Sequence, residues 1–115
     1  MRLPKRKLGQ LGEQQAKKYL KNKGYHFIAQ NFHTKFGEID LIFKDDDQIV
    51  FVEVKTRSSN YTGLPEEAIT SKKISHLKKT IDIFYLKHLK LSRFARIDAI
   101  SIMGNKIKHI KNITQ

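Results

Sequence analysis

The chain has 115 residues, which suits one domain and is enough to bury a core without disulfide or metal staples. Cysteine is absent, so disulfides, zinc ribbons and thiol catalysis are excluded, and we expect a cytoplasmic protein. The net charge is +12, from 23 Lys and Arg against 11 Asp and Glu. This excess favours a polyanionic partner, nucleic acid ahead of an anionic membrane surface; the alternative is a basic surface that only keeps the protein in solution.

No apolar run approaches the roughly 18 residues of a membrane-spanning helix, so we expect no membrane insertion. Residues 1–8 are basic and predict a flexible arm that precedes a single domain over residues 9–115. A helix is predicted from about residue 9 to residue 23, ended by Gly24. Its apolar and small residues recur at helical spacing on one stripe: Leu8, Gly12, Ala16, Tyr19 and Leu20.

Residues 25–32 predict a first strand, and the next two apolar runs, 37–43 and 49–57, predict a hairpin around the polar turn 44–48. Charges lie inside this hairpin, among them Asp40 in its first strand, and Glu53 and Lys55 in its second. Because side chains alternate along a strand, Glu53 and Lys55 share one face. Burying an unpaired charge is costly, so this group of charges needs an explanation.

The rest of the chain predicts a loop over 58–65, a second helix from Thr70–Ser71 to about residue 89, and strands at 95–102 and 106–110. The apolar stripe of the second helix is Ile74, Leu77, Ile81, Phe84 and Tyr85. Parallel strands need a crossover connection, and this helix supplies one. The element order α-β-β-β-α-β-β therefore predicts a mixed α/β fold with a central mixed sheet flanked by helices.

Six of the 11 acidic residues are explained by turns, by a helix start or as a single acid on a lysine-rich helix. Five lie within or against apolar elements: Glu13, Glu38, Asp40, Glu53 and Asp98. A hard divalent cation, Mg²⁺ or Mn²⁺, holds carboxylates together and can activate water at a phosphodiester. We therefore expect Asp40 and Glu53 as metal ligands, with Glu13 as a further ligand from the first helix. Lys55 would orient the attacking water or stabilise the developing charge.

A structural alternative remains open: Glu53 and Lys55 form an ordinary ion pair, and Asp40 caps a turn or pairs with an arginine. The segments Gly37–Ile42 and Phe51–Arg57 also resemble the signature of the YraN-like family of small bacterial proteins. The resemblance extends to Gly12–Glu13 and to Arg96–Asp98. Two positions depart from it: Ile97, where the family usually has Phe, and His33, where it has arginine.

That family is similar to the PD-(D/E)xK restriction-endonuclease-like superfamily and, within it, to archaeal Holliday junction resolvases. The resemblance implies a restriction-endonuclease-like core, Asp40 and Glu53 as metal ligands, Lys55 as the catalytic lysine and Glu13 as a helix-borne acid. It also points to a homodimer, because resolvases of this fold class act as two-fold dimers. The apolar region 97–113 is the candidate dimer face, unless it only completes the sheet.

The expected function is a metal-dependent endonuclease that hydrolyses phosphodiester bonds of DNA, on branched or otherwise structured substrates. The alternatives are a non-catalytic nucleic-acid-binding module and an assembly protein on the same fold. Cations and one aromatic residue near the acidic motif are the candidates for nucleic-acid contacts. They are His33, Lys35, Arg57, Tyr61, Lys72 and Lys73.

Overall fold

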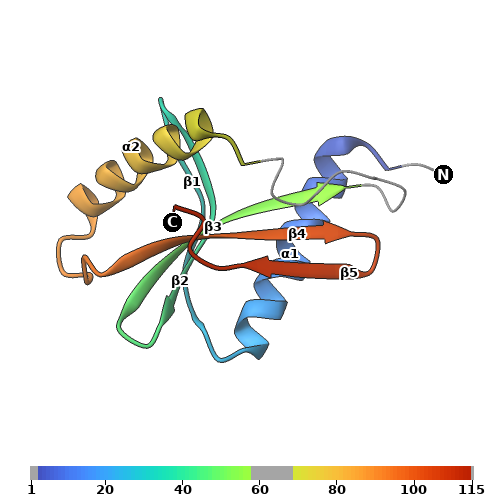
Figure 1. The fold of residues 1–115 in the computed structure, drawn as a ribbon, viewed down its shortest axis with the longest axis horizontal. Helices are drawn as coiled ribbons and strands as arrows, with labels where there is room; N and C mark the ends of the chain where they lie inside the picture. Colours follow the sequence, from blue (N-terminus) through green and yellow to red (C-terminus); the bar gives the residue numbers. More distant parts are fainter. Residues whose placement is uncertain (1–2, 58–68, 115) are drawn as a thin grey trace.

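The computed structural model describes residues 3–57 and 69–114. Two helices and five strands follow the predicted order (Figure 1). They are α1 (Lys5–Asn22), β1 (His26–Thr34), β2 (Gly37–Asp45), β3 (Gln48–Arg57), α2 (Ser71–Lys87), β4 (Ala95–Met103) and β5 (Lys106–Ile110). In the part of the chain so described, neither helix is long and apolar enough to cross a membrane.

The five strands form one mixed sheet in the order β1-β2-β3-β4-β5. Strand β3 is parallel to β4, and the other three neighbouring pairs are antiparallel. Helix α2 lies in the connection between the two parallel strands, as predicted. The mixed α/β class is thus confirmed, and the arrangement is compatible with a restriction-endonuclease-like core.

The two helices cover opposite faces of the sheet, and each covers its own apolar cluster. Ala16 and Leu20 of α1 pack with one set of strand residues: Leu41, Phe43, Val50, Val52, Ile100 and Ile102. Leu77, Phe84 and Tyr85 of α2 pack with the other set: Ile39, Ile42, Ile49, Phe51 and Ile97. The protein therefore has three layers, helix, sheet and helix.

Helix α1 approaches the sheet closely because it has a glycine where it crosses β3. A Cβ added at Gly12 would overlap Oγ1 of Thr56 and lie 3.3 Å from its Cβ. The predicted buried stripe is correct for Gly12, Ala16 and Leu20, but Leu8 is 39% exposed. The contact at Gly12 brings the neighbouring Glu13 to the edge of the sheet.

Two predicted boundaries are wrong. Helix α1 begins at Lys5, so residues 5–8 of the predicted arm are helical. The chain can turn there because Pro4 precedes the first turn in an extended conformation and its carbonyl accepts the amide of Leu8. Helix α2 ends at Lys87, two residues early, because His88 leaves the helical region.

Residues 97–102 of the candidate dimer face are internal, whereas residues 103–113 are half-buried or exposed and include the edge strand β5. Strand β4 lies between β3 and β5, and Ile97, Ile100 and Ile102 are 5% exposed or less. These three residues complete the sheet and the two apolar clusters, and a dimer through the rest of the region stays a prediction.

Candidate metal and nucleic-acid site

Strands β2 and β3 separate at the predicted acidic pair. They pair from Asp45 opposite Gln48 to Leu41 opposite Val52. Beyond that point β2 continues to pair with β1, while β3 continues to pair with β4. The first residues past the separation are Asp40 and Glu53, and we call this place the fork. In Figure 1 the β1–β2 hairpin turns toward α2 while β3 runs on beside β4.

Alternation along β3 puts Glu53 on the α2 face. The pair Ile42 and Phe51 packs under α2, and the next pair, Leu41 and Val52, packs under α1. Glu53 therefore returns to the α2 side, where Lys73 contacts it. Alternation does not extend through Asp40, because Ile39 packs under α2 as Ile42 does. Asp40 and Glu53 are both buried, with 8% and 7% of their surface exposed. The fold thus brings together the two predicted metal ligands.

The Asp40 carboxylate is fixed by the backbone of β3. Its Oδ2 accepts a hydrogen bond of 2.8 Å from the amide of Val54. That amide lies beyond the last paired residues of β2 and β3, so the carboxylate takes the place of a strand partner. One oxygen of Asp40 is anchored in this way.

Four carboxylates at the fork interact electrostatically with one another. Burial raises the pKa of Asp40 to about 8, and Glu53, Glu13 and Glu38 add to that rise against the hydrogen bond from Val54. The pKa of Glu13 is also raised, by burial first and then by Glu38 and Glu53. Crowded carboxylates of this kind favour either a shared proton or a bound cation.

Asn31 joins two of these acids. With its amide oriented to satisfy both, the nitrogen donates to Oε1 of Glu13 at 2.9 Å and to Oε1 of Glu38 at 3.0 Å. Its backbone is left-handed, with φ of 53°, which asparagine tolerates better than most residues. Asn31 and Phe32 also match the family that the motifs resemble, but the sequence assigned no contact to Asn31, since an asparagine in a strand has no pattern that reveals a long-range bridge.

The cation on Glu53 comes from α2. Nζ of Lys73 lies 2.5 Å from Oε1 of Glu53. Lys55, the predicted catalytic lysine, is half-buried on the strand face of Glu53, but no described carboxylate pairs with it. The predicted alternative, an ion pair between Glu53 and Lys55, is therefore wrong in this structure.

The oxygen donors at the fork are of the type that Mg²⁺ binds, and an open magnesium site here stays a prediction. Within residues 3–57 and 69–114, no three His, Asp or Glu side chains converge as a closed metal cage. Mg²⁺ commonly takes only one or two carboxylates and keeps several waters. Asp40 and Glu53 supply two hard oxygen donors in a buried position. Glu13 is tied to Asn31, and its role as a third ligand stays a prediction.

The predicted nucleic-acid contacts lie mostly around the fork. His33 and Lys35 are exposed near the turn between β1 and β2, where Nε2 of His33 is 3.4 Å from Oε1 of Glu38. Lys72 is exposed in the first turn of α2, and Arg57 ends β3. Tyr61 falls outside the described residues.

The hairpin turn and α2 are linked beside the fork. Oγ1 of Thr34 lies 3.2 Å from Oγ1 of Thr80. The exposed cations of the β1–β2 turn and those of the first turn of α2 thus belong to two elements that contact each other. What these cations bind stays a prediction.

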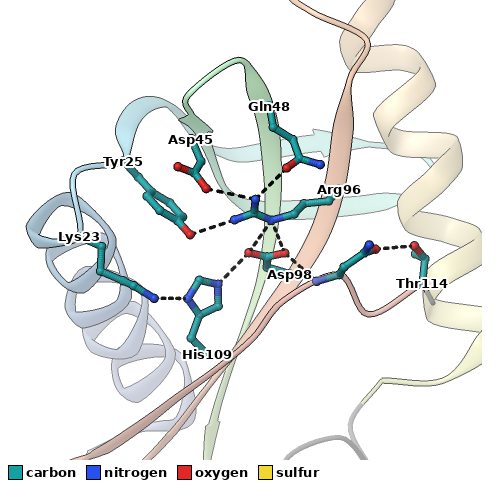
Figure 2. A network of polar contacts seen from close by, with 9 residues as sticks. Lys23, Tyr25, Asp45, Gln48, Arg96, Asp98, His109 and Thr114 are labelled. Atoms are coloured by element: carbon teal, nitrogen blue, oxygen red, sulfur yellow. Dashed lines mark hydrogen bonds and ion pairs between the residues drawn. The ribbon is translucent and has the colours of Figure 1, made fainter.

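Asp98 is the last of the five acids that lie within or against apolar elements, and it belongs to a separate ionic network (Figure 2). It has no exposed surface, and it accepts from Nε of Arg96 at 3.0 Å, from the amide of Asn112 at 2.9 Å and from Nε2 of His109 at 2.7 Å. Burial raises the pKa of Asp98, but the hydrogen bonds from His109, Arg96 and Asn112 outweigh it and lower the pKa.

The same arginine ties this network to other elements. Its terminal nitrogens donate to Asp45, Gln48 and Tyr25, as Figure 2 shows. Every polar group of Asp98 is occupied by protein atoms, so the network holds β4, β5 and the β2–β3 turn together. The role of this network is therefore to stabilise the fold.

The fold and the fork define a mixed α/β protein whose sheet opens at a pair of buried carboxylates. The chain belongs to the uncharacterised protein family UPF0102, whose model matches residues 12–102, and this is the YraN family that its motifs resemble. A UPF0102 protein of Syntrophomonas wolfei is 49% identical over 114 residues, which cover 93% of this chain and 96% of that protein.

Two further relatives match this chain over similar shares of its length and of their own. A UPF0102 protein of Persephonella marina is 44% identical, over 90% of each chain. One of Campylobacter fetus is 43% identical, over 90% of this chain and 89% of its own length. The chain therefore corresponds to nearly the whole length of these relatives.

Proposed function

We propose that this protein is a cytoplasmic, metal-dependent endonuclease that hydrolyses phosphodiester bonds of DNA, on branched or otherwise structured substrates. The observation that carries the proposal is the meeting of Asp40 and Glu53 at the fork. Two buried acids at the fork, with one oxygen anchored by the β3 backbone, suit a hard divalent cation. The net charge of +12 suits a polyanionic substrate.

Each residue of the fork has a defined task in this proposal. Asp40 and Glu53 hold Mg²⁺ or Mn²⁺, which supplies Lewis-acid chemistry at the scissile phosphate. Lys55 orients the attacking water or stabilises the charge that develops in the transition state. The exposed cations of the β1–β2 turn and of α2 position the phosphate backbone.

The test is cleavage of a panel of duplex, flap and four-way DNA substrates in Mn²⁺. We expect the wild type to cut at least one substrate, and Glu53→Ala and Lys55→Ala to lose about 100-fold or more of that rate. Asp82→Ala and Lys90→Ala are matched controls, because they remove one acid and one lysine at exposed positions. A panel left intact by the wild type would count against the enzyme for those substrates.

A second candidate is a non-catalytic nucleic-acid-binding module. It is favoured by the ion pair that already neutralises Glu53, and by the absence of an ion pair between Lys55 and any described carboxylate. This function predicts binding without cleavage, with an affinity that falls steeply as salt rises. It also predicts that Asp40→Asn leaves binding unchanged.

A further inference from the structure

Lys73 holds the carboxylate that a cation at the fork would need. Its Nζ lies 2.5 Å from Oε1 of Glu53, and the Glu53 side chain is only 8% exposed while that of Lys73 is 35% exposed. The backbone of Lys73 is fixed independently, because its amide donates to the N-cap residue Thr70 at 3.1 Å. The ammonium can therefore leave Glu53 without disturbing the start of α2.

The charges at the fork are unbalanced even with this contact. Four carboxylates interact here, Glu13, Glu38, Asp40 and Glu53, and the ammonium of Lys73 neutralises one of them. A divalent cation between Asp40 and Glu53 would carry twice the charge of an ammonium and would require the same Glu53 oxygens. The two cations therefore compete for one carboxylate.

We propose that Lys73 is a resident countercation of Glu53, that a divalent cation displaces it, and that the freed ammonium then binds a backbone phosphate of the nucleic acid. This inference rests on the proposed metal site. Its consequence is thermodynamic coupling: cation binding raises the affinity for nucleic acid, and nucleic acid raises the affinity for the cation by the same factor.

Lys72 provides a matched control on the same turn of α2. It is exposed, and no described carboxylate pairs with it. Lys72→Gln and Lys73→Gln remove the same charge from adjacent positions, so a general loss of positive potential affects both variants. Only Lys73→Gln removes the competitor at Glu53.

The first measurement is calorimetric titration of Ca²⁺ into the protein without nucleic acid. We expect Lys73→Gln to bind Ca²⁺ roughly fivefold or more tightly than the wild type, within the usual range of coupling between sites. Lys72→Gln should stay within about twofold of the wild type, as expected for an exposed charge. Lys73→Arg should bind Ca²⁺ more weakly, because a guanidinium holds a carboxylate with two hydrogen bonds.

The second measurement is the affinity for a four-way DNA junction, by fluorescence anisotropy, in EDTA and in Ca²⁺. Lys73→Gln should bind the junction like the wild type in EDTA and lose roughly fivefold or more in Ca²⁺. Lys72→Gln should lose the same factor in both buffers, because its ammonium is available to phosphate throughout.

Two results would overturn the inference. If Lys73→Gln and Lys72→Gln behave alike in both measurements, Lys73 is an ordinary surface cation and the inference fails. The proposed function would still stand in that case if the wild type cleaves DNA in Mn²⁺. Absence of Ca²⁺ binding by the wild type and by Lys73→Gln alike would remove the metal site itself, and the inference with it.

Discussion

Asp40 accepts the amide of Val54 at 2.8 Å across the point where β2 and β3 separate. This single hydrogen bond satisfies a backbone donor that the open sheet leaves without a strand partner, and it orients a buried carboxylate toward Glu53. The fork is therefore formed by the backbone as much as by the side chains. Asn31 and Lys73 complete it from β1 and α2.

Asp40→Asn should stabilise the protein at alkaline pH in the absence of metal. The pKa of Asp40 is raised from 3.8 to about 8, so between these values the folded protein holds more protons than the unfolded chain. The free energy of unfolding then falls as pH rises through that window, and asparagine, which can still accept the Val54 amide, avoids the loss. One pKa unit corresponds to about 1.4 kcal/mol, so we expect a gain of about 1–3 kcal/mol at pH 8.

Urea denaturation in EDTA at pH 5 and pH 8 measures this effect. The advantage of Asp40→Asn over the wild type should grow between the two pH values, and Asp82→Asn, at an exposed site on α2, should show no such growth. Added Mg²⁺ should stabilise the wild type and not Asp40→Asn. Equal stability of the wild type and Asp40→Asn at pH 8 would contradict the electrostatic account of the fork.

Two glycines of α1 should respond in opposite directions to alanine. A Cβ at Gly12 would overlap Thr56, whereas a Cβ at Gly9 meets nothing within 4 Å. Gly9→Ala should raise the free energy of unfolding by about 0.5–1 kcal/mol through helix propensity. Gly12→Ala should lower it by about 1–3 kcal/mol, because α1 must move away from β3. A stabilising Gly12→Ala, measured by denaturant unfolding, would mean that α1 does not cross β3 as described.

Two substitutions separate the backbone role of Asn31 from the role of its side chain. Asn31→Gly keeps the left-handed conformation at φ of 53° and removes the bridge between Glu13 and Glu38, whereas Asn31→Ala removes both. We expect Asn31→Ala to be less stable than Asn31→Gly by about 1–2 kcal/mol. Both variants should also differ from the wild type in their affinity for Ca²⁺, because each releases Glu13 from its hydrogen bond with Asn31. Equal stability of the two variants would refute the strained backbone at this position.

Asp98→Asn should destabilise the fold without a specific effect on the fork. It leaves Arg96 buried beside a neutral amide, and removal of one partner of a buried ion pair typically costs about 3–5 kcal/mol. Because the pKa of Asp98 is lowered below 3.8, its contribution is present above that pH and is lost as the solution is acidified further. Urea unfolding at pH 7 measures the cost, and any cleavage rate per folded molecule should match the wild type.

The sequence revealed the residues whose type conflicts with their surroundings. Asp40 and Glu53 were predictable because an acid in an apolar, β-branched strand is rare, and alternation placed Glu53 on one face with Lys55. The fold class followed from element order, and the N-cap at Thr70 followed from residue type.

Partners that depend on long-range register were not predictable. Lys73 was expected to contact phosphate, and its ion pair with Glu53 depends on how α2 lies across the sheet. The bridge from Asn31 to Glu13 depends on the position of α1, and the contact of His109 with Asp98 depends on the β4–β5 register. The separation of β2 and β3 at Asp40 is likewise a property of four strands, β1 to β4, which no local pattern encodes.

The central claim is that a divalent cation binds between Asp40 and Glu53, and a crystal soaked in Mn²⁺ tests it most directly. The account predicts an anomalous density peak at coordination distance from both carboxylates, about 2.1 Å for a cation of this kind, with Nζ of Lys73 moved away from Glu53. A crystal with no peak at the fork, and with Lys73 still on Glu53, would contradict the account.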